Sequence, residues 1–100
     1  MELQSIGAGQ YRVKGRLTFE TVTQALKSTS PDFSQSNAVQ IDLSEVKGFD
    51  SAGLALMIEW FVRATLANTT VTYTGVPPSL FALAKISNLD QLLALQSPAA

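Results

Sequence analysis

The chain has 100 residues, of which 46% are hydrophobic and 15% charged, and its formal net charge is −1. We expect a single domain over residues 1–100, because a chain of this length and apolar content can build one core. The seven Lys and Arg residues are scattered along the sequence, which argues against a nucleic-acid interface and gives little attraction to an anionic membrane surface.

The chain contains neither cysteine nor histidine. Their absence excludes disulfides, thiol chemistry, the usual zinc sites and catalysis by an imidazole. The first residues lack the basic and apolar regions of a signal peptide, and the longest apolar run is broken by Glu59. A cytoplasmic protein without direct membrane insertion is therefore expected.

The first half of the chain predicts a hairpin followed by a helix. Residues 3–6 are a short edge strand, a turn follows at 7–9, and residues 11–17 alternate apolar and polar as a half-buried strand does. Thr18 is a candidate N-cap of a helix that ends near residue 28, with Phe19, Val22 and Leu26 at helical spacing on its apolar side. A polar connection then continues to residue 37.

The second half predicts alternating strands and helices. Residues 38–43 form a central strand, and a loop over 44–50 follows, with Val46 and Phe49 as its buried anchors. The main helix spans 51–67 and is closed by Asn68. A β-branched strand at 70–74, a helix at 79–89 and a short element at 91–95 complete the chain. The order indicates a small α/β fold whose mixed sheet is mostly parallel with an antiparallel edge, with helices packed on it.

Asp50 and Ser51 stand where the main helix begins. Both are good N-cap types, because a side-chain oxygen accepts a hydrogen bond from a free amide of the first turn. A hydroxyl at a helix start is also a natural place to add a phosphate or to present to a partner. A plain N-cap alone would equally explain a serine here.

A helical wheel of the main helix separates two sides. Leu54, Ile58, Phe61 and Thr65, flanked by Met57 and Val62, form the expected core stripe. The opposite side carries the residues Ala52, Leu56, Glu59, Trp60 and Arg63. The pair Glu59–Arg63 is typical of a solvated face, so Leu56 and Trp60 are candidates for a partner surface. Two interpretations of Trp60 stay open: partner contact, or completion of the core beneath neighbouring elements.

The sequence offers little support for catalysis. The run at 50–53 is not a Gly-x-Ser-x-Gly elbow, and no phosphate-binding loop ending in Gly-Lys-Ser/Thr occurs. Asp42 and Asp50 could together bind Mg²⁺ near the end of the third strand. The preferred interpretation is that Asp42 is structural and Asp50 is a cap, so we expect a protein that is not an enzyme, without cofactor or metal.

Several segments in order resemble the STAS domain family, named for sulphate transporters and anti-sigma-factor antagonists. The resemblance rests on Gly-Arg-Leu at 15–17, Ile-Asp-Leu-Ser at 41–44, Phe-Asp-Ser-Ala-Gly-Leu at 49–54 and the helix at 80–89. It covers nearly the whole chain and implies a STAS-like fold. In the antagonist branch, the hydroxyl residue after the aspartate is phosphorylated by a partner serine kinase, which assigns that role to Ser51. Ala52 stands where that branch often has a second serine.

A second branch resembles the chain more closely: the small STAS subunit of the Mla phospholipid-transport ABC complex, called MlaB-like. The shared segments lie at residues 53–56, 74–76, 83–85 and 88–89. This resemblance implies a subunit that binds and regulates the transporter's ATPase subunit, is held at the inner membrane only through that partner, and helps maintain outer-membrane lipid asymmetry. The expected partner-binding residues are Asp50, Ser51, Ala52, Leu56 and Trp60. The alternative is an anti-sigma-factor antagonist, with an anti-sigma factor and a serine kinase as partners, switched by phosphorylation of Ser51.

Overall fold

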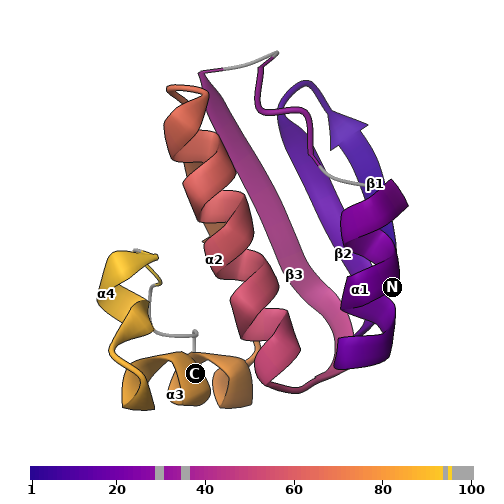
Figure 1. Ribbon diagram of the computed structural model, residues 1–100, viewed down its shortest axis with the longest axis vertical. Coiled ribbons are helices and arrows are strands. Elements are labelled where there is room, and N and C mark those ends of the chain that lie inside the picture. The colour runs from indigo at the N-terminus through magenta and orange to yellow at the C-terminus, as the bar shows by residue number, and fades with distance from the viewer. Residues whose placement is uncertain (29–30, 35–36, 94, 96–100) are drawn as a thin grey trace.

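The computed structural model describes the backbone of residues 1–28, 31–34, 37–93 and 95, and the side chains of the same residues except 24–28. The elements follow the predicted alternation of strands and helices (Figure 1). They are β1 (Glu2–Gly7), β2 (Gln10–Leu17), α1 (Phe19–Ser28), β3 (Ala38–Phe49), α2 (Ser51–Leu66), β4 (Thr70–Thr74), α3 (Pro78–Ile86) and α4 (Leu89–Leu92). The helix predicted at 79–89 ends earlier, at Ile86, and the last predicted element, placed at 91–95, overlaps the short helix α4 only at residues 91–92.

The four strands form one mixed sheet in the order β1-β2-β3-β4. β1 pairs with β2 antiparallel, as a short hairpin does, whereas β2–β3 and β3–β4 are parallel. Helices α1 and α2 supply the crossovers that parallel neighbours require. The predicted sheet, mostly parallel with an antiparallel edge, is confirmed.

Strand β3 is longer than predicted. The expected loop over 44–50 is wrong, because pairing with β2 continues to the partners Leu17 and Phe49. Two register shifts interrupt this pairing, so the segment lacks the regular alternation by which a strand is recognised in sequence. Val46 and Phe49, predicted as buried anchors, are half-buried and pack against the edge of the core.

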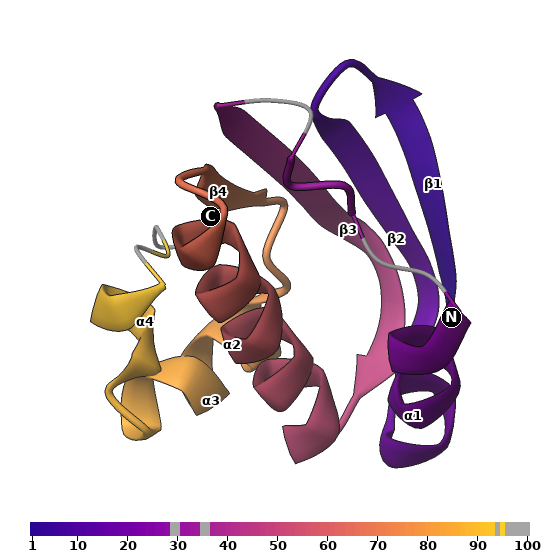
Figure 2. The same cartoon turned by 45° about the horizontal axis from the view of Figure 1, so that its top comes forward.

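The helices α1 and α2 cover one face of the sheet, with α3 and α4 beside α2 (Figures 1 and 2). Along β3, Val39, Ile41 and Leu43 are buried toward the helices, and the residues between them are exposed or half-buried on the other face. The core therefore lies between one sheet face and the helices. No helix in the described part of the chain combines the length and hydropathy needed to cross a membrane.

The orientation of α2 differs from the prediction. Leu56 is 1% exposed and Trp60 0% exposed, so their placement on an outward partner surface is wrong. The predicted core stripe is also displaced: Leu54 is buried, but Val62 is 44% exposed. Apolar residues occur around nearly the whole helix, so several neighbouring stripes on the helical wheel are about equally apolar. The pattern therefore does not identify the buried side.

Trp60 completes the core, which was the other interpretation left open. Its indole N–H is buried and finds no hydrogen-bond partner in the structure as described. Nearby on the same helix, the Met57 carbonyl accepts a hydrogen bond of 2.7 Å from the Tyr73 hydroxyl. This bond ties α2 to β4, and burial raises the pKa of Tyr73 far above its ordinary value.

Helix α1 also differs in one residue from its predicted apolar side. Val22 is buried as expected, whereas Phe19 is 71% exposed. Phe19 is the first residue of α1, at the end of the helix, and its side chain stays largely in solvent. The side chain of Leu26, the third predicted member, lies outside the described residues.

Candidate functional site

The candidate site lies where two parallel strands end and two helices begin. Leu17, the last residue of β2, is the register partner of Phe49, the last residue of β3. The Leu17 carbonyl accepts a hydrogen bond of 3.1 Å from the Asp50 amide. Because both strands end at one edge of the sheet, the first residues of α1 and α2 lie next to each other, as the cartoon shows at the foot of both helices (Figure 1).

Asp50 joins these two helices. Its backbone is extended, and Oδ1 accepts a hydrogen bond of 2.8 Å from the amide of Ala52, which caps α2 as predicted. Oδ2 accepts a second bond of 3.1 Å from the amide of Phe19, the first residue of α1. One carboxylate therefore satisfies an unpaired amide at the start of each helix, where the helix dipole favours negative charge.

A hydroxyl network fixes the connection from β2 to α1. Thr21 Oγ1 donates to the Arg16 carbonyl over 2.6 Å and accepts from the Thr18 amide over 3.0 Å. The Thr18 carbonyl accepts the first helical bond, 2.8 Å from the Val22 amide. Thr18 thus occupies the predicted N-cap position, and the connection from β2 to α1 is held by these hydrogen bonds.

The residues after Asp50 have separate geometric roles. Ser51 opens α2 with an exposed side chain, and Ala52 is half-buried. A Cβ at Gly53 would lie 2.8 Å from Leu17 Cβ and 2.9 Å from the Leu17 carbonyl oxygen, so glycine alone lets α2 pack this closely on the end of β2. The motif at 50–53 thus combines a cap, an outward hydroxyl and a close helix–strand contact.

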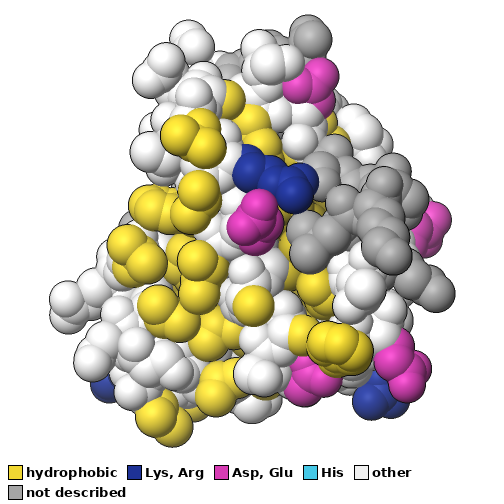
Figure 3. Space-filling model, viewed as in Figure 1, with side chains coloured by type: hydrophobic (Ala, Val, Ile, Leu, Met, Phe, Trp, Pro, Cys, Tyr) yellow, Lys and Arg dark blue, Asp and Glu magenta, His cyan; other side chains and the backbone are white. Residues whose placement is uncertain are grey.

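The outward face of α2 continues from Ser51 as an apolar stripe, which we call the α2 stripe. Its members recur at helical spacing: Ala55, Ile58, Val62 and Leu66. Ala55 is exposed, Ile58 is half-buried, and Val62 and Leu66 are 44% and 81% exposed. Figure 3 shows apolar side chains gathered along α2 and toward α3 and α4 on this side of the molecule. This stripe, rather than Leu56 and Trp60, is what α2 presents outward.

Glu59 and Arg63 form the predicted pair at the margin of this face. Arg63 Nε donates to Glu59 Oε1 over 3.0 Å, and both side chains are partly exposed. A pair of this kind contributes a few tenths of a kcal/mol to the helix, about 0.3–0.5 kcal/mol. The prediction that this pair lies in contact with solvent is confirmed, although apolar side chains lie beside it.

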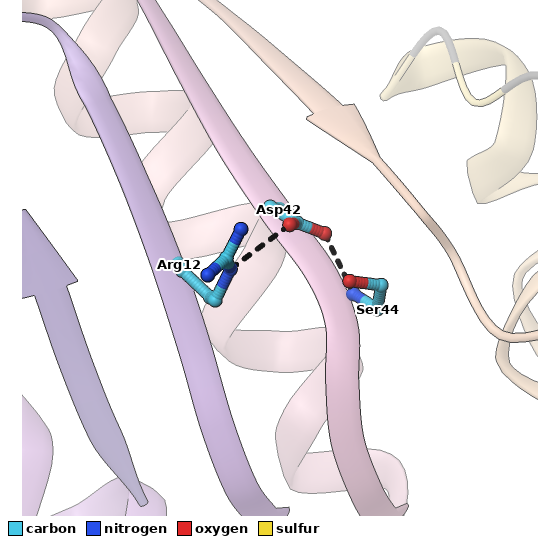
Figure 4. Close-up of polar contacts among 3 residues, drawn as sticks. All are labelled: Arg12, Asp42 and Ser44. Atoms are coloured by element: carbon cyan, nitrogen blue, oxygen red, sulfur yellow. Dashed lines mark hydrogen bonds and ion pairs between the residues drawn. The ribbon is translucent and has the colours of Figure 1, made fainter. Parts of the chain in front are cut away.

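Asp42 belongs to a different part of the molecule from Asp50. It accepts bonds of 3.1 Å from Arg12 Nε and 2.8 Å from the Ser44 amide, on the sheet face away from the helices (Figure 4). Partial burial by itself raises the pKa of Asp42, but the hydrogen bonds from Ser44 and the Arg12 guanidinium outweigh it and hold the pKa below its usual value. The two carboxylates of the magnesium hypothesis thus have separate partners, and the preferred structural interpretation of Asp42 agrees with its contacts.

Comparison with known proteins adds family and fold. A family model described as "Mlab, STAS domain" matches residues 5–95. Among solved structures, the chain is similar to a sulfate transporter family protein from Wolinella succinogenes, with a TM-score of 0.67 and 14% identity over 90% of this chain and 75% of that one. It is also similar to the anti-sigma factor antagonist SpoIIAA in its unphosphorylated form, with a TM-score of 0.62 and 13% identity over 85% and 81% of the two chains. At such identities these structures support the fold alone. No curated protein sequence matches the chain.

Proposed function

This chain belongs to the STAS family described as Mlab, STAS domain, and from that premise we propose that it binds and regulates the ATPase subunit of a Mla-type ABC transporter. STAS domains are generally non-catalytic binding modules, and in this proposal ATP hydrolysis belongs wholly to the partner. The chain is held at the cytoplasmic side of the inner membrane through that partner, and the complex serves outer-membrane lipid asymmetry.

The observation that carries the proposal is the exposed hydroxyl of Ser51 at the head of the α2 stripe. A run of exposed apolar side chains along one helix face is unfavourable in water and is typical of a surface that a partner covers. The helix has a fixed start, because Asp50 and Gly53 anchor it to β2. The surface is therefore presented from a rigid element, which lowers the entropic cost of binding.

The proposed docking surface keeps part of the predicted set and replaces the rest. Ser51 and Ala52 make the contact at the head of the helix, and Asp50 positions them through its bond to the Ala52 amide. Leu56 and Trp60 are buried in the core and contribute by packing α2 against the rest of the domain. The contacting apolar residues are those of the α2 stripe.

The substitution Ser51→Glu tests the proposal. It adds bulk and charge at the head of the docking surface, and we expect affinity for the purified ATPase subunit to fall at least about 10-fold, or about 1.4 kcal/mol. Folding should be unaffected, because a carboxylate suits the first turn of a helix. Calorimetric titration measures the affinity, and circular dichroism with a thermal melt checks the fold.

Thr72→Glu is the matched control, because Thr72 is exposed on β4 between buried Val71 and Tyr73, on the sheet face away from the helices. It should bind like the wild type. Equal affinities for wild type, Ser51→Glu and Thr72→Glu would remove Ser51 from the interface. A wild-type chain that does not bind the ATPase subunit at all would reject the proposed function.

A second candidate is an anti-sigma-factor antagonist switched by phosphorylation of Ser51. The exposed position of the Ser51 side chain favours it, because a kinase needs access to the hydroxyl. A phosphate there would add up to two negative charges at the head of the docking surface. Incubation with the cognate serine kinase and ATP, followed by intact mass measurement, tests this function: one added phosphate that is absent in Ser51→Ala supports it.

A further inference from the structure

Phe19 is a large aromatic side chain left in water at the candidate site. It is 71% exposed, although it is the first residue of a helix that packs on the sheet. Three residues later, Val22 is buried, so α1 contacts the core without help from Phe19. The aromatic ring is thus not required by the fold, and its exposure is unfavourable by the apolar area left in contact with water.

The backbone of Phe19 is held in place next to Ser51. Its amide donates to Asp50 Oδ2 over 3.1 Å, and Asp50 is the residue directly before Ser51. The Phe19 carbonyl accepts a bond of 2.8 Å from Thr23 Oγ1 one turn further along α1. Because both backbone groups are bonded, the ring is presented from a fixed position, as an anchor residue at an interface requires.

Two acidic side chains lie close to Phe19. Glu20 follows it with an exposed side chain, and Asp50 contacts its amide through a carboxylate at the surface. The nearest cation along the chain, Arg16, precedes the buried Leu17 in strand β2, and alternation turns its side chain to the sheet face away from the helices. A complementary partner would therefore present basic groups around an apolar hollow.

We propose that Phe19 is a second anchor of the docking surface, whose ring enters an apolar pocket bordered by Lys or Arg on the ATPase subunit. The proposal rests on the proposed function, since it assumes that this partner covers the start of α2. It extends the interface from α2 to α1. Asp50 is the positioning residue that keeps Phe19 and Ser51 side by side, because its two carboxylate oxygens bond to both helix starts.

The experiment compares Phe19→Ala with Ile86→Ala in calorimetric titrations against the purified ATPase subunit. Ile86 is the matched control, because it is an 81% exposed apolar residue on α3, outside the docking surface. Phe19→Ala should weaken binding about 30-fold, as loss of an interface anchor does. Ile86→Ala should stay within about 3-fold of the wild type, and thermal melts of both variants should match it.

Glu20→Gln tests the basic border of the pocket. It should weaken binding by about 3-fold at low ionic strength and reduce the dependence of affinity on salt, because a charge pair at the rim has been removed. A Glu20→Gln variant with unchanged affinity and salt dependence would show that no basic group of the partner borders the pocket at Glu20. The role of the ring is tested separately by Phe19→Ala.

The outcomes separate this inference from the proposed function. If the wild type binds and Ser51→Glu does not, but Phe19→Ala binds like the wild type, the anchor role of Phe19 is overturned and the proposed function stands. If the wild type does not bind the ATPase subunit, the proposed function fails and the anchor proposal falls with it. Loss of binding by Ile86→Ala equal to that by Phe19→Ala also overturns the proposal, since the effect would then not be specific to α1.

Discussion

At the scale of single residues, Asp50 shows how one side chain acquires two roles. Its bond to Ala52 is local and is the ordinary work of an N-cap, worth about 1 kcal/mol. Its bond to Phe19 joins residues 31 positions apart and aligns a second helix. Asp42, by contrast, uses its oxygens on Arg12 and Ser44 within the sheet. The two aspartates therefore support the site and the sheet, respectively.

The contacts of Asp42 lead us to expect that the free energy of unfolding depends on pH. A carboxyl group whose pKa is lower in the folded chain than its ordinary value of 3.8 stabilises the fold above that value. This contribution is lost as the pH falls through the folded pKa, because the protonated group accepts more weakly from Ser44 and no longer attracts Arg12. In urea unfolding, the wild type should exceed Asp42→Asn by a constant free energy between about pH 5 and 7, and the difference should shrink below about pH 4. A difference independent of pH would contradict this assignment.

At the scale of the elements, the contact between α2 and the end of β2 sets the site. Gly53 lies so close to Leu17 that a Cβ at position 53 would clash with it. This contact turns one side of α2 to the sheet and brings Leu56, Met57 and Trp60 into the core. The same rotation turns Ser51 and the α2 stripe outward, so the buried and the exposed faces of the helix have one cause.

Gly53→Ala should therefore destabilise the fold. Alanine improves helix propensity by about 1 kcal/mol, but overpacking at 2.8 Å costs about 1–3 kcal/mol and has only backbone and Leu17 Cβ to displace. We expect a net loss of stability of about 1 kcal/mol in urea unfolding. Gly48→Ala is the control and should change little, because its Cβ would lie 3.9 Å from its nearest neighbour, Arg16 Nε. A stabilised Gly53→Ala variant would show that the helix can move away from β2 without penalty.

At the scale of the whole molecule, the helices and the sheet form two layers with a single core between them. Its largest fully buried side chain is Trp60, and Leu17, Ile41 and Leu80 are also inaccessible. Because the other face of the sheet carries polar side chains such as Asp42 and Thr72, stability depends on this one core. The proposed docking surface lies on the outer side of the helical layer, so core and interface are separate sides of α2.

Trp60→Ala should lower the free energy of unfolding by about 3–5 kcal/mol, the usual cost of removing a buried aromatic ring. The free energy of unfolding of a 100-residue domain is about 5–15 kcal/mol in total. The substitution would remove a large part of it, so any loss of binding would follow from loss of fold. Urea unfolding followed by circular dichroism measures the effect. Leu66→Ala, at an 81% exposed position, should leave stability within about 0.5 kcal/mol. A Trp60→Ala variant that is as stable as the wild type yet fails to bind would show that Trp60 takes part in the interface.

The sequence by itself determined the features that depend on neighbours within one or two turns. The order of strands and helices, the Asp50 cap, the start of α2 at Ser51 and the closing Asn68, with its positive φ of 57°, all follow from local spacing and residue type. The family followed as well, because its motif consists of adjacent residues. Such features are encoded where they occur, since their hydrogen bonds close over a few residues.

Tertiary structure decided which side each element turns inward. The extension of β3 to Phe49 needed β2 as its partner, and the burial of Trp60 needed the other elements that pack around α2. The bond from Phe19 to Asp50 joins chain segments that meet only when parallel strands are paired. The physical reason is common to these cases: a helix that is apolar on nearly every side, or a strand with register shifts, has several orientations of similar energy. The layer packed against it selects one of them.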